Sequence, residues 1–96
     1  MNYSFHPEAE EEFISAIMYY EDRQKRLGEE FAREVYKAVK EIIIHPRMWP
    51  WFDENIRRRI LNRFPYSILY SVDRDEICIL AVMHLHRNPD YWKSRL

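Results

Sequence analysis

Residues 57–92 read RRRILNRFPYSILYSVDRDEICILAVMHLHRNPDYW, and the spacing of apolar side chains in this stretch decides the fold. Between residues 66 and 72 a large apolar side chain recurs at every second position, which is typical of a strand with one buried face. Residues 77–86 are apolar on both faces, which favours a central strand. The turn sequence DRDE joins these two segments, so we expect them to pair. Residues 56–60, where isoleucine alternates with arginine, predict a further strand.

Two helices are expected upstream of this stretch. Residues 7 to about 25 carry apolar side chains at helical spacing behind an opening proline. The glutamates within residues 8–12 complement the dipole of the helix N-terminus, which explains them without a catalytic role. A second apolar stripe covers residues 27–42 and stops before a His-Pro pair. Gly28, the only glycine, is predicted to be a left-handed cap in the turn of this helical hairpin.

The segment PRMWPWFDEN, residues 46–55, has two prolines and no apolar period, so it is predicted to be a loop. We expect Trp49, Trp51 and Phe52 to fold back and cover one end of the core. An exposed tryptophan pair that docks a partner is the alternative.

These elements predict an α+β fold in a single domain, residues 1–96. A short N-terminal strand at residues 3–5 is followed by the helical hairpin and a mostly antiparallel sheet of three further strands. The hairpin should cover one face of the sheet. The opposite face would then be left to polar or partner-binding residues.

Charge and composition narrow the classes of function. The net charge of −1 hides an acidic half, residues 1–54 with 12 acidic against 7 basic residues, and a basic half, residues 55–96 with 4 against 8. The overall charge therefore argues against a nucleic-acid-binding protein, but it leaves a local basic face possible. Cys78 lies in an apolar run and is expected to be a buried, inert thiol. No apolar run approaches the ~20 residues of a bilayer span, and no secretory signal is evident, so we expect a cytoplasmic protein without a membrane partner.

The basic half holds the side chains that could carry chemistry or binding. A proton-transfer group together with arginines that hold a phosphate would suit RNA cleavage. The candidates are Arg63, His84, His86, Arg87 and Tyr91. A basic and aromatic surface would instead suit an acidic protein partner. The candidates for partner binding are Arg57, Arg58, Arg59, Trp92 and Lys93.

Two structural alternatives stay open for these groups. The arginines of the strand can form a solvated face that is paired with the acidic helices. Tyr91 and Trp92 can pack as a C-terminal clasp. His84 and His86 share one strand face but have no third ligand at metal-binding spacing, so we expect no metal and no cofactor.

In their order and spacing, these motifs resemble the RelE/ParE superfamily, the toxins of bacterial type II toxin-antitoxin modules, also labelled plasmid stabilisation proteins. The resemblance spans nearly the whole chain through FHPEAEEEF, LGEEFAREV, IIIHPRMWP and the stretch quoted above. It implies a compact toxin that is neutralised by a cognate antitoxin, whose helical or extended segment lies across it. RelE-like members cleave mRNA on the ribosome, whereas ParE-like members inhibit DNA gyrase and are not themselves enzymes.

Individual residues bear on the choice between these branches. RNA-cleaving members carry an arginine after the aromatic residue that opens the third strand, and the corresponding position here is Ser67. That branch is also strongly basic, unlike this chain. His84, His86, Arg87 and Tyr91 nevertheless lie where that branch places functional groups. The resemblance therefore predicts ParE-like inhibition of DNA gyrase, with ribosome-dependent mRNA cleavage as the alternative and an antitoxin-binding module without toxicity as a third possibility.

Overall fold

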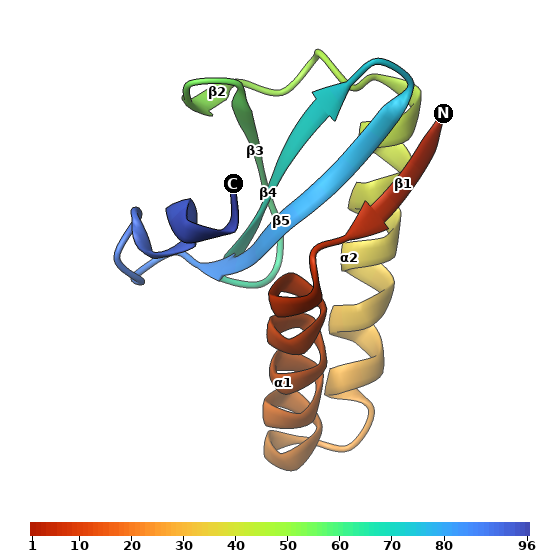
Figure 1. Ribbon diagram of the computed structural model, residues 1–96. Coiled ribbons are helices and arrows are strands. Elements are labelled where there is room, and N and C mark those ends of the chain that lie inside the picture. The colour runs from red at the N-terminus through yellow and green to blue at the C-terminus, as the bar shows by residue number, and fades with distance from the viewer.

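A helical hairpin packed on one mixed sheet makes up the protein (Figure 1). The computed structural model describes residues 1–96. In chain order the elements are β1 (Asn2–Phe5), α1 (Pro7–Arg23), α2 (Leu27–Ile44), β2 (Trp51–Asp53), β3 (Ile56–Ile60), β4 (Tyr66–Asp73), β5 (Glu76–His84) and the 3₁₀ helix η1 (Tyr91–Arg95). The sheet order is β1-β5-β4-β3-β2, with β1 parallel to β5 and every other pair antiparallel. The predicted α+β architecture is confirmed.

The strand count after the hairpin was predicted wrongly, because β2 lies in the segment that was expected to be a loop. It has three residues and holds its place by pairing Trp51 with Arg57 and Asp53 with Ile56. A strand this short shows no alternation in sequence. Its position depends on a neighbouring strand rather than on its own pattern.

The main core lies between the hairpin and the sheet, as predicted. Both predicted apolar stripes face it, and the side chains of Phe31, Ile68 and Tyr70 are fully buried there. Aromatic rings from four elements meet in this layer. The centroids of Phe31 and Phe64 are 5.1 Å apart in an edge-to-face arrangement, a geometry that adds to simple burial. Apolar burial of this kind holds the hairpin against the sheet.

Gly28 has a different role from the predicted left-handed cap. It is the second residue of α2, and the left-handed residue in the turn is Arg26, with φ 72°. A Cβ atom at position 28 would lie 2.4 Å from the carbonyl oxygen of Ile17. The two helices therefore approach so closely here that only glycine fits. Glu21 at the end of α1 accepts hydrogen bonds from the amides of Arg26 and Gly28, and so caps α2.

The face of the sheet away from the hairpin is partly covered, contrary to the expectation that it is left to partners. A second core joins Trp92 of η1 to Ile56, Leu69, Leu80, Ala81 and Met83 of the sheet. The residues after β5 turn back so that η1 lies over this face (Figure 1). The cause is visible in β5, which is apolar on both sides and needs cover on both. Neither helix is long and apolar enough to cross a membrane.

Candidate functional site

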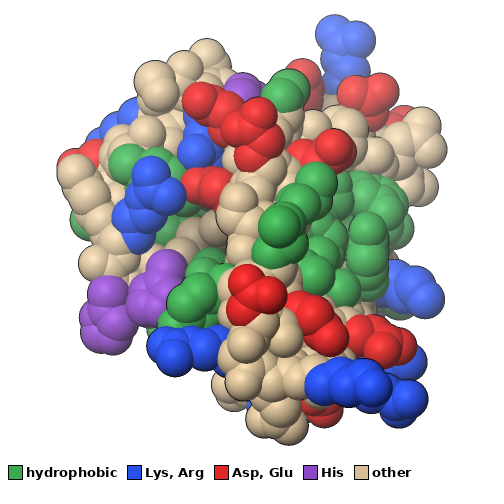
Figure 2. All heavy atoms as spheres, turned by 90° about the horizontal axis from the view of Figure 1, so that it is seen from below, with side chains coloured by type: hydrophobic (Ala, Val, Ile, Leu, Met, Phe, Trp, Pro, Cys, Tyr) green, Lys and Arg blue, Asp and Glu red, His purple; other side chains and the backbone are tan.

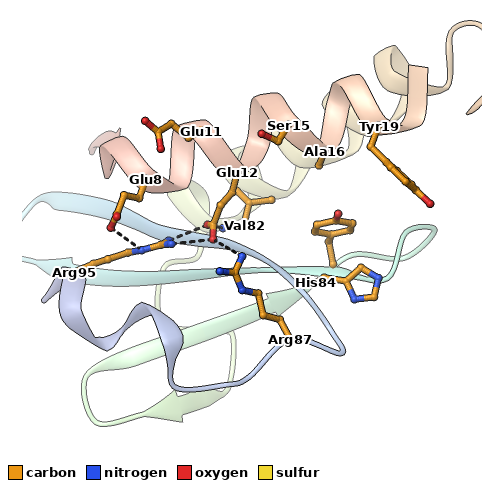
Figure 3. A pocket seen from close by; sticks show the side chains of 11 residues that line it. Glu8, Glu11, Glu12, Ser15, Ala16, Tyr19, Val82, His84, Arg87 and Arg95 are labelled. Atoms are coloured by element: carbon orange, nitrogen blue, oxygen red, sulfur yellow. Dashed lines mark hydrogen bonds and ion pairs between the residues drawn. The ribbon is translucent and has the colours of Figure 1, made fainter. Parts of the chain in front are cut away.

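Glu12, on the side of α1 that faces the sheet, is the centre of a network of polar contacts (Figure 3). Its side chain is only 14% exposed. One carboxylate oxygen, Oε1, accepts hydrogen bonds from the Val82 amide at 3.1 Å and from Arg95 Nη1 at 2.9 Å. The other, Oε2, accepts from the Tyr91 hydroxyl at 2.5 Å and from Arg95 Nη2 at 2.9 Å. The Nη1 atom of Arg87 lies 3.6 Å from Oε2. We call these five residues the Glu12 site.

The Glu12 site forms where β1 stops covering the edge of β5. The pairing of the two strands ends opposite Ile79, and the later residues of β5 have no neighbouring strand on that side. A peptide group left unpaired there, next to α1, would cost free energy. Glu12 satisfies the Val82 amide, and Arg95 Nη1 donates to the Leu80 carbonyl at 2.8 Å. Two side chains thus complete the edge that β1 leaves open.

The surroundings of Tyr91 and Arg95 in this site favour the protonated form of both side chains. Burial, and then the hydrogen bond to Glu12, raise the pKa of Tyr91 far above the usual range of a phenol. The hydrogen bond to Glu12 likewise raises the pKa of Arg95, whose side chain is only 6% exposed. At neutral pH the Tyr91 hydroxyl is therefore a proton donor to Glu12. It is a poor general base.

A cavity of about 460 Å³ opens beside the Glu12 site, between α1 and the end of β5 (Figure 3). Its wall includes three glutamates, at positions 8, 11 and 12, and two arginines, Arg87 and Arg95. The face of the molecule seen from below also intersperses acidic with basic side chains (Figure 2). A phosphate that entered this cavity would meet carboxylates together with the two guanidinium groups. The arrangement lacks the excess positive charge of a phosphate site.

Four of the five residues predicted for RNA cleavage lie in one region. The imidazole of His84 is 5.4 Å from that of His86 and 5.1 Å from the ring of Tyr66, measured between centroids. The guanidinium of Arg87 stacks on the Tyr91 ring, with Cζ 3.7 Å from the ring centroid.

Arg63 lies apart from these four. It pairs with Glu30 of α2 at 3.2 Å, and its amide donates to Glu34 of the same helix at 3.0 Å. Arg63 is also absent from the wall of the cavity beside Glu12. The structure thus assembles four of the predicted groups and holds the fifth against α2.

Glu12 and Arg95 are site residues that the sequence patterns did not predict. Glu12 was interpreted with its neighbours as a group that favours the helix dipole. A signal was present, because Glu12 lies three residues after Ala9 and four before Ala16, both buried, so it shares their side of the helix. Arg95 gave no such signal. It lies near the end of the chain, and only the fold brings it to α1.

A second group of cationic side chains lies on the other edge of the sheet, where β2 pairs with β3. Three arginines of β3 each stack on an aromatic ring. The distances from Cζ to ring centroid are 3.7 Å for Arg57 on Trp51, 4.6 Å for Arg58 on Phe52 and 4.6 Å for Arg59 on Trp49. Such stacks orient the guanidinium without neutralising its charge.

Trp51 does not cover the core as predicted, because its side chain is 62% exposed. Trp49 packs against the main core and Phe52 against the second one, in agreement with the prediction. The difference follows from the alternation of β2, which turns neighbouring side chains to opposite faces. Trp51 reaches the surface beside Arg57, its partner on β3.

The residues predicted for partner binding divide into free and occupied groups. Arg57 and Arg58 make no ion pair. Arg59 is nearly buried and pairs with Glu41 at 2.9 Å. Lys93 pairs with Asp53 and Asp90. Trp92 is 1% exposed, so it offers a partner no surface and instead packs as the C-terminal clasp.

Comparison with known proteins identifies the family. The family described as "ParE toxin of type II toxin-antitoxin system, parDE" matches residues 3–89 of the chain. The chain belongs to the ParE toxin family. The resemblance to the RelE/ParE superfamily that was inferred from the sequence motifs is thereby confirmed. Among curated proteins no match is found.

A solved structure supports the same fold for this ParE-family toxin. The "Chromosomal ParDE TA system from P. aeruginosa" superposes with a TM-score of 0.65 at 18% sequence identity, covering 90% of this chain and 97% of that chain. At this identity the likeness shows the fold alone. The family match ends at residue 89, so it includes Glu12, Val82 and Arg87 but neither Tyr91 nor Arg95 of the Glu12 site.

Proposed function

We propose that this ParE-family toxin arrests growth by binding and inhibiting DNA gyrase, and that a cognate antitoxin neutralises it. The observation that carries the proposal is the occupied state of the Glu12 site. Arg87 and Tyr91, which RNA cleavage would need, are already engaged by the carboxylate of Glu12. Inhibition by binding makes no demand on these groups. The proposal places the toxin in the cytoplasm with its target.

The chemistry of RNA cleavage explains why this occupancy matters. A general base must accept a proton near neutral pH, and cations must be free to stabilise the charge that develops on phosphate. The raised pKa of Tyr91 opposes the first requirement. The ion pair of Arg87 with Glu12 opposes the second. Ser67, at the position where the RNA-cleaving branch carries an arginine, is fully buried.

Two parallel assays test the proposal. Purified toxin should block negative supercoiling of a relaxed plasmid by DNA gyrase, and purified ribosomes with a defined mRNA should yield no new 5′ ends. Intact supercoiling together with cut mRNA would reverse the assignment. Normal growth on expression without an antitoxin, with both assays negative, would instead favour the antitoxin-binding module without toxicity.

A ribosome-dependent mRNA endoribonuclease is the second candidate, and one arrangement favours it. His84, His86 and Arg87 lie together at the end of β5, and imidazole is the side chain that most often transfers protons in catalysis. Replacing both histidines with alanine should then abolish growth arrest if RNA is cut. If gyrase is the target, the double variant should keep its toxicity. His45, exposed at the end of α2, provides a matched control as His45→Ala.

Neutralisation by an antitoxin is testable without knowing its sequence in advance. A small protein encoded next to the toxin gene should co-purify with it and restore growth when both are expressed. A neighbour that neither binds nor protects would contradict this part of the proposal.

A further inference from the structure

The surface beside Trp51 combines an exposed aromatic ring with an arginine that makes no ion pair. A groove of about 370 Å³ runs along the Trp51–Arg57 stack, and Arg47, Val72 and Asp73 also line it. We call it the Trp51 groove. We propose that this groove binds the toxin's protein target through an acidic side chain that the target presents next to an apolar one. The inference rests on the proposed function, and the target is therefore DNA gyrase.

The guanidinium of Arg57 is held in place with its donors largely unused. It stacks on Trp51 at 3.7 Å, and one nitrogen, Nη1, donates to the carbonyl of Trp49 at 2.7 Å. A guanidinium has five N–H groups, and this bond uses one of them. Stacking occupies only the flat face of the group, so its edge stays available for a two-point bond to a carboxylate. Binding would cost little ordering of this side chain, because it is already fixed.

The positive charge around the groove is only partly balanced by the chain itself. Neither Arg57 nor Arg47 has a carboxylate within ion-pair distance. Asp73 is the one acidic residue in the wall, against two arginines. The remaining positive charge complements an acidic partner.

The protein itself contains an occupied version of the same arrangement. Arg87 stacks on Tyr91 at 3.7 Å, the same distance as Arg57 on Trp51, and there the guanidinium faces the carboxylate of Glu12. The two stacks differ because no carboxylate of the chain lies within ion-pair distance of Arg57. An acidic side chain is therefore the group that would complete it.

Apolar exposure indicates that the partner is a protein. Trp51 is 62% exposed; Ile44, the last residue of α2, is 68% exposed, and Met48, between α2 and β2, is 57% exposed. Of these three residues Trp51 lines the groove, beside Arg57, and tryptophan and arginine are the residues enriched in binding hot spots. A nucleic-acid backbone would use the arginines and leave these apolar groups in water.

The test uses full-length toxin with DNA gyrase holoenzyme, in the absence and in the presence of plasmid. Trp51→Ala and Arg57→Gln should each raise the toxin concentration for half-inhibition of supercoiling by about tenfold. Both variants should weaken binding to gyrase without DNA by a similar factor. Met18→Ala removes an equally exposed apolar group on α1, 62%, and Arg33→Gln an exposed arginine on α2, so both should stay close to wild type.

The outcomes separate the two proposals. If wild type and Trp51→Ala had the same concentration for half-inhibition, binding through the Trp51 groove would be rejected and gyrase inhibition would stand. A wild-type toxin that leaves supercoiling unchanged would overturn both. Unchanged affinity for gyrase alone, with a loss of affinity only for DNA, would assign the groove to nucleic acid and reject the protein partner. Circular dichroism and thermal unfolding verify that each variant is folded.

Discussion

Two arginine–aromatic stacks, one after the end of β5 and one on β3, have the same distance of 3.7 Å from Cζ to ring centroid but differ in their charged surroundings. Arg87, which stacks on Tyr91, forms an ion pair with a carboxylate of the same chain. Arg57, which stacks on Trp51, forms none. Tyr91 and Glu12 are 79 positions apart in sequence, so the occupied stack depends on the whole fold. An arginine beside an aromatic ring therefore does not by itself mark a functional site. The counter-charge decides whether it stabilises the fold or is free to bind.

The position of each stack in the sheet explains the difference. The Glu12 site lies where β5 loses its neighbour β1, and side chains must complete the strand edge there. The Trp51 stack lies on β2, a three-residue strand at the other end of the sheet order. Short edge strands with charged side chains are a common defence against edge-to-edge pairing. Here the same strand also presents an apolar ring, which gives the edge a surface that can bind.

Removing the counter-charge should have the largest effect on stability. Glu12→Ala leaves the buried Arg95 with Glu8 as its only ion-pair partner, and it removes the acceptor of the Val82 amide and of the Tyr91 hydroxyl. We expect a loss of about 3 kcal/mol in the free energy of unfolding, measured in urea, because the buried charge of Arg95 then has only the exposed carboxylate of Glu8 to compensate it.

Glu10→Ala is the matched control, since Glu10 is exposed on the same helix and makes no ion pair. It should change stability by less than about 0.5 kcal/mol. Equal stability of the two variants would mean that the Glu12 site does not hold the C-terminal segment. The contrast between the two stacks would then lose its physical basis.

Supplying a counter-charge to the open stack should have the next largest effect, on binding. Arg47→Glu places a carboxylate in the Trp51 groove, where it can pair with Arg57 and mimic Glu12. We expect gyrase inhibition to weaken by about tenfold or more, because one cation is lost and the other is occupied. Arg47→Gln, which removes the charge without supplying a counter-charge, should weaken inhibition less. Equal effects of the two substitutions would show that an internal carboxylate does not close the groove.

The sequence predicted the parts of this molecule that a local pattern encodes. Apolar periods located α1, α2, β4 and β5, because burial of one face imposes a period of its own on each element. It did not predict β2, whose three residues are too few to show a period. Gly28 was found but misinterpreted, because the need for glycine arises from the approach of Ile17 in another helix.

The candidate sites divide in the same way. His84, His86 and Arg87 are close in sequence, so their grouping was predictable, whereas Arg63 had to be placed by the fold and lies against α2 instead. Whether an arginine is free depends on acidic residues far along the chain. Sequence spacing carries no information about such a contact. The exposed state of Trp51 was likewise set by the unforeseen strand β2.

Tyr91→Phe should have a smaller effect, which shrinks above pH ~10. At neutral pH it removes one hydrogen bond to Glu12, and we expect a loss of about 1 kcal/mol in the free energy of unfolding. Above pH ~10 the wild type should lose stability, because the pKa of Tyr91 is raised in the folded protein and the unfolded chain releases its phenolic proton first. The stabilisation is complete below the unfolded pKa and is lost as pH rises towards the folded one.

Part of the loss of stability at alkaline pH should persist in Tyr91→Phe. Burial raises the pKa of Tyr70 to about 12, and its hydroxyl donates to the Pro46 carbonyl at 2.7 Å. The variant should therefore show a shallower decline in stability between pH ~10 and ~12 than wild type, and Tyr70→Phe offers the complementary comparison. Unfolding in urea at successive pH values measures both slopes. Identical slopes for wild type and Tyr91→Phe would contradict the raised pKa of Tyr91.

The smallest expected effect on stability belongs to Trp51→Ala. Removal of a tryptophan from a core costs about 3–5 kcal/mol, but at 62% exposure most of this side chain never leaves water on folding. Its main contact is the stack with Arg57, and such stacks at exposed sites contribute about 0.5–1 kcal/mol. Loss of β propensity adds little on a three-residue strand. We therefore expect unfolding in urea to show a change below about 1 kcal/mol, in contrast to the tenfold loss of gyrase inhibition. Trp92→Ala, which removes a buried ring, should lower the free energy of unfolding several times as much. If Trp51→Ala destabilised the protein equally, the Trp51–Arg57 stack would be a structural element, like the Arg87–Tyr91 stack.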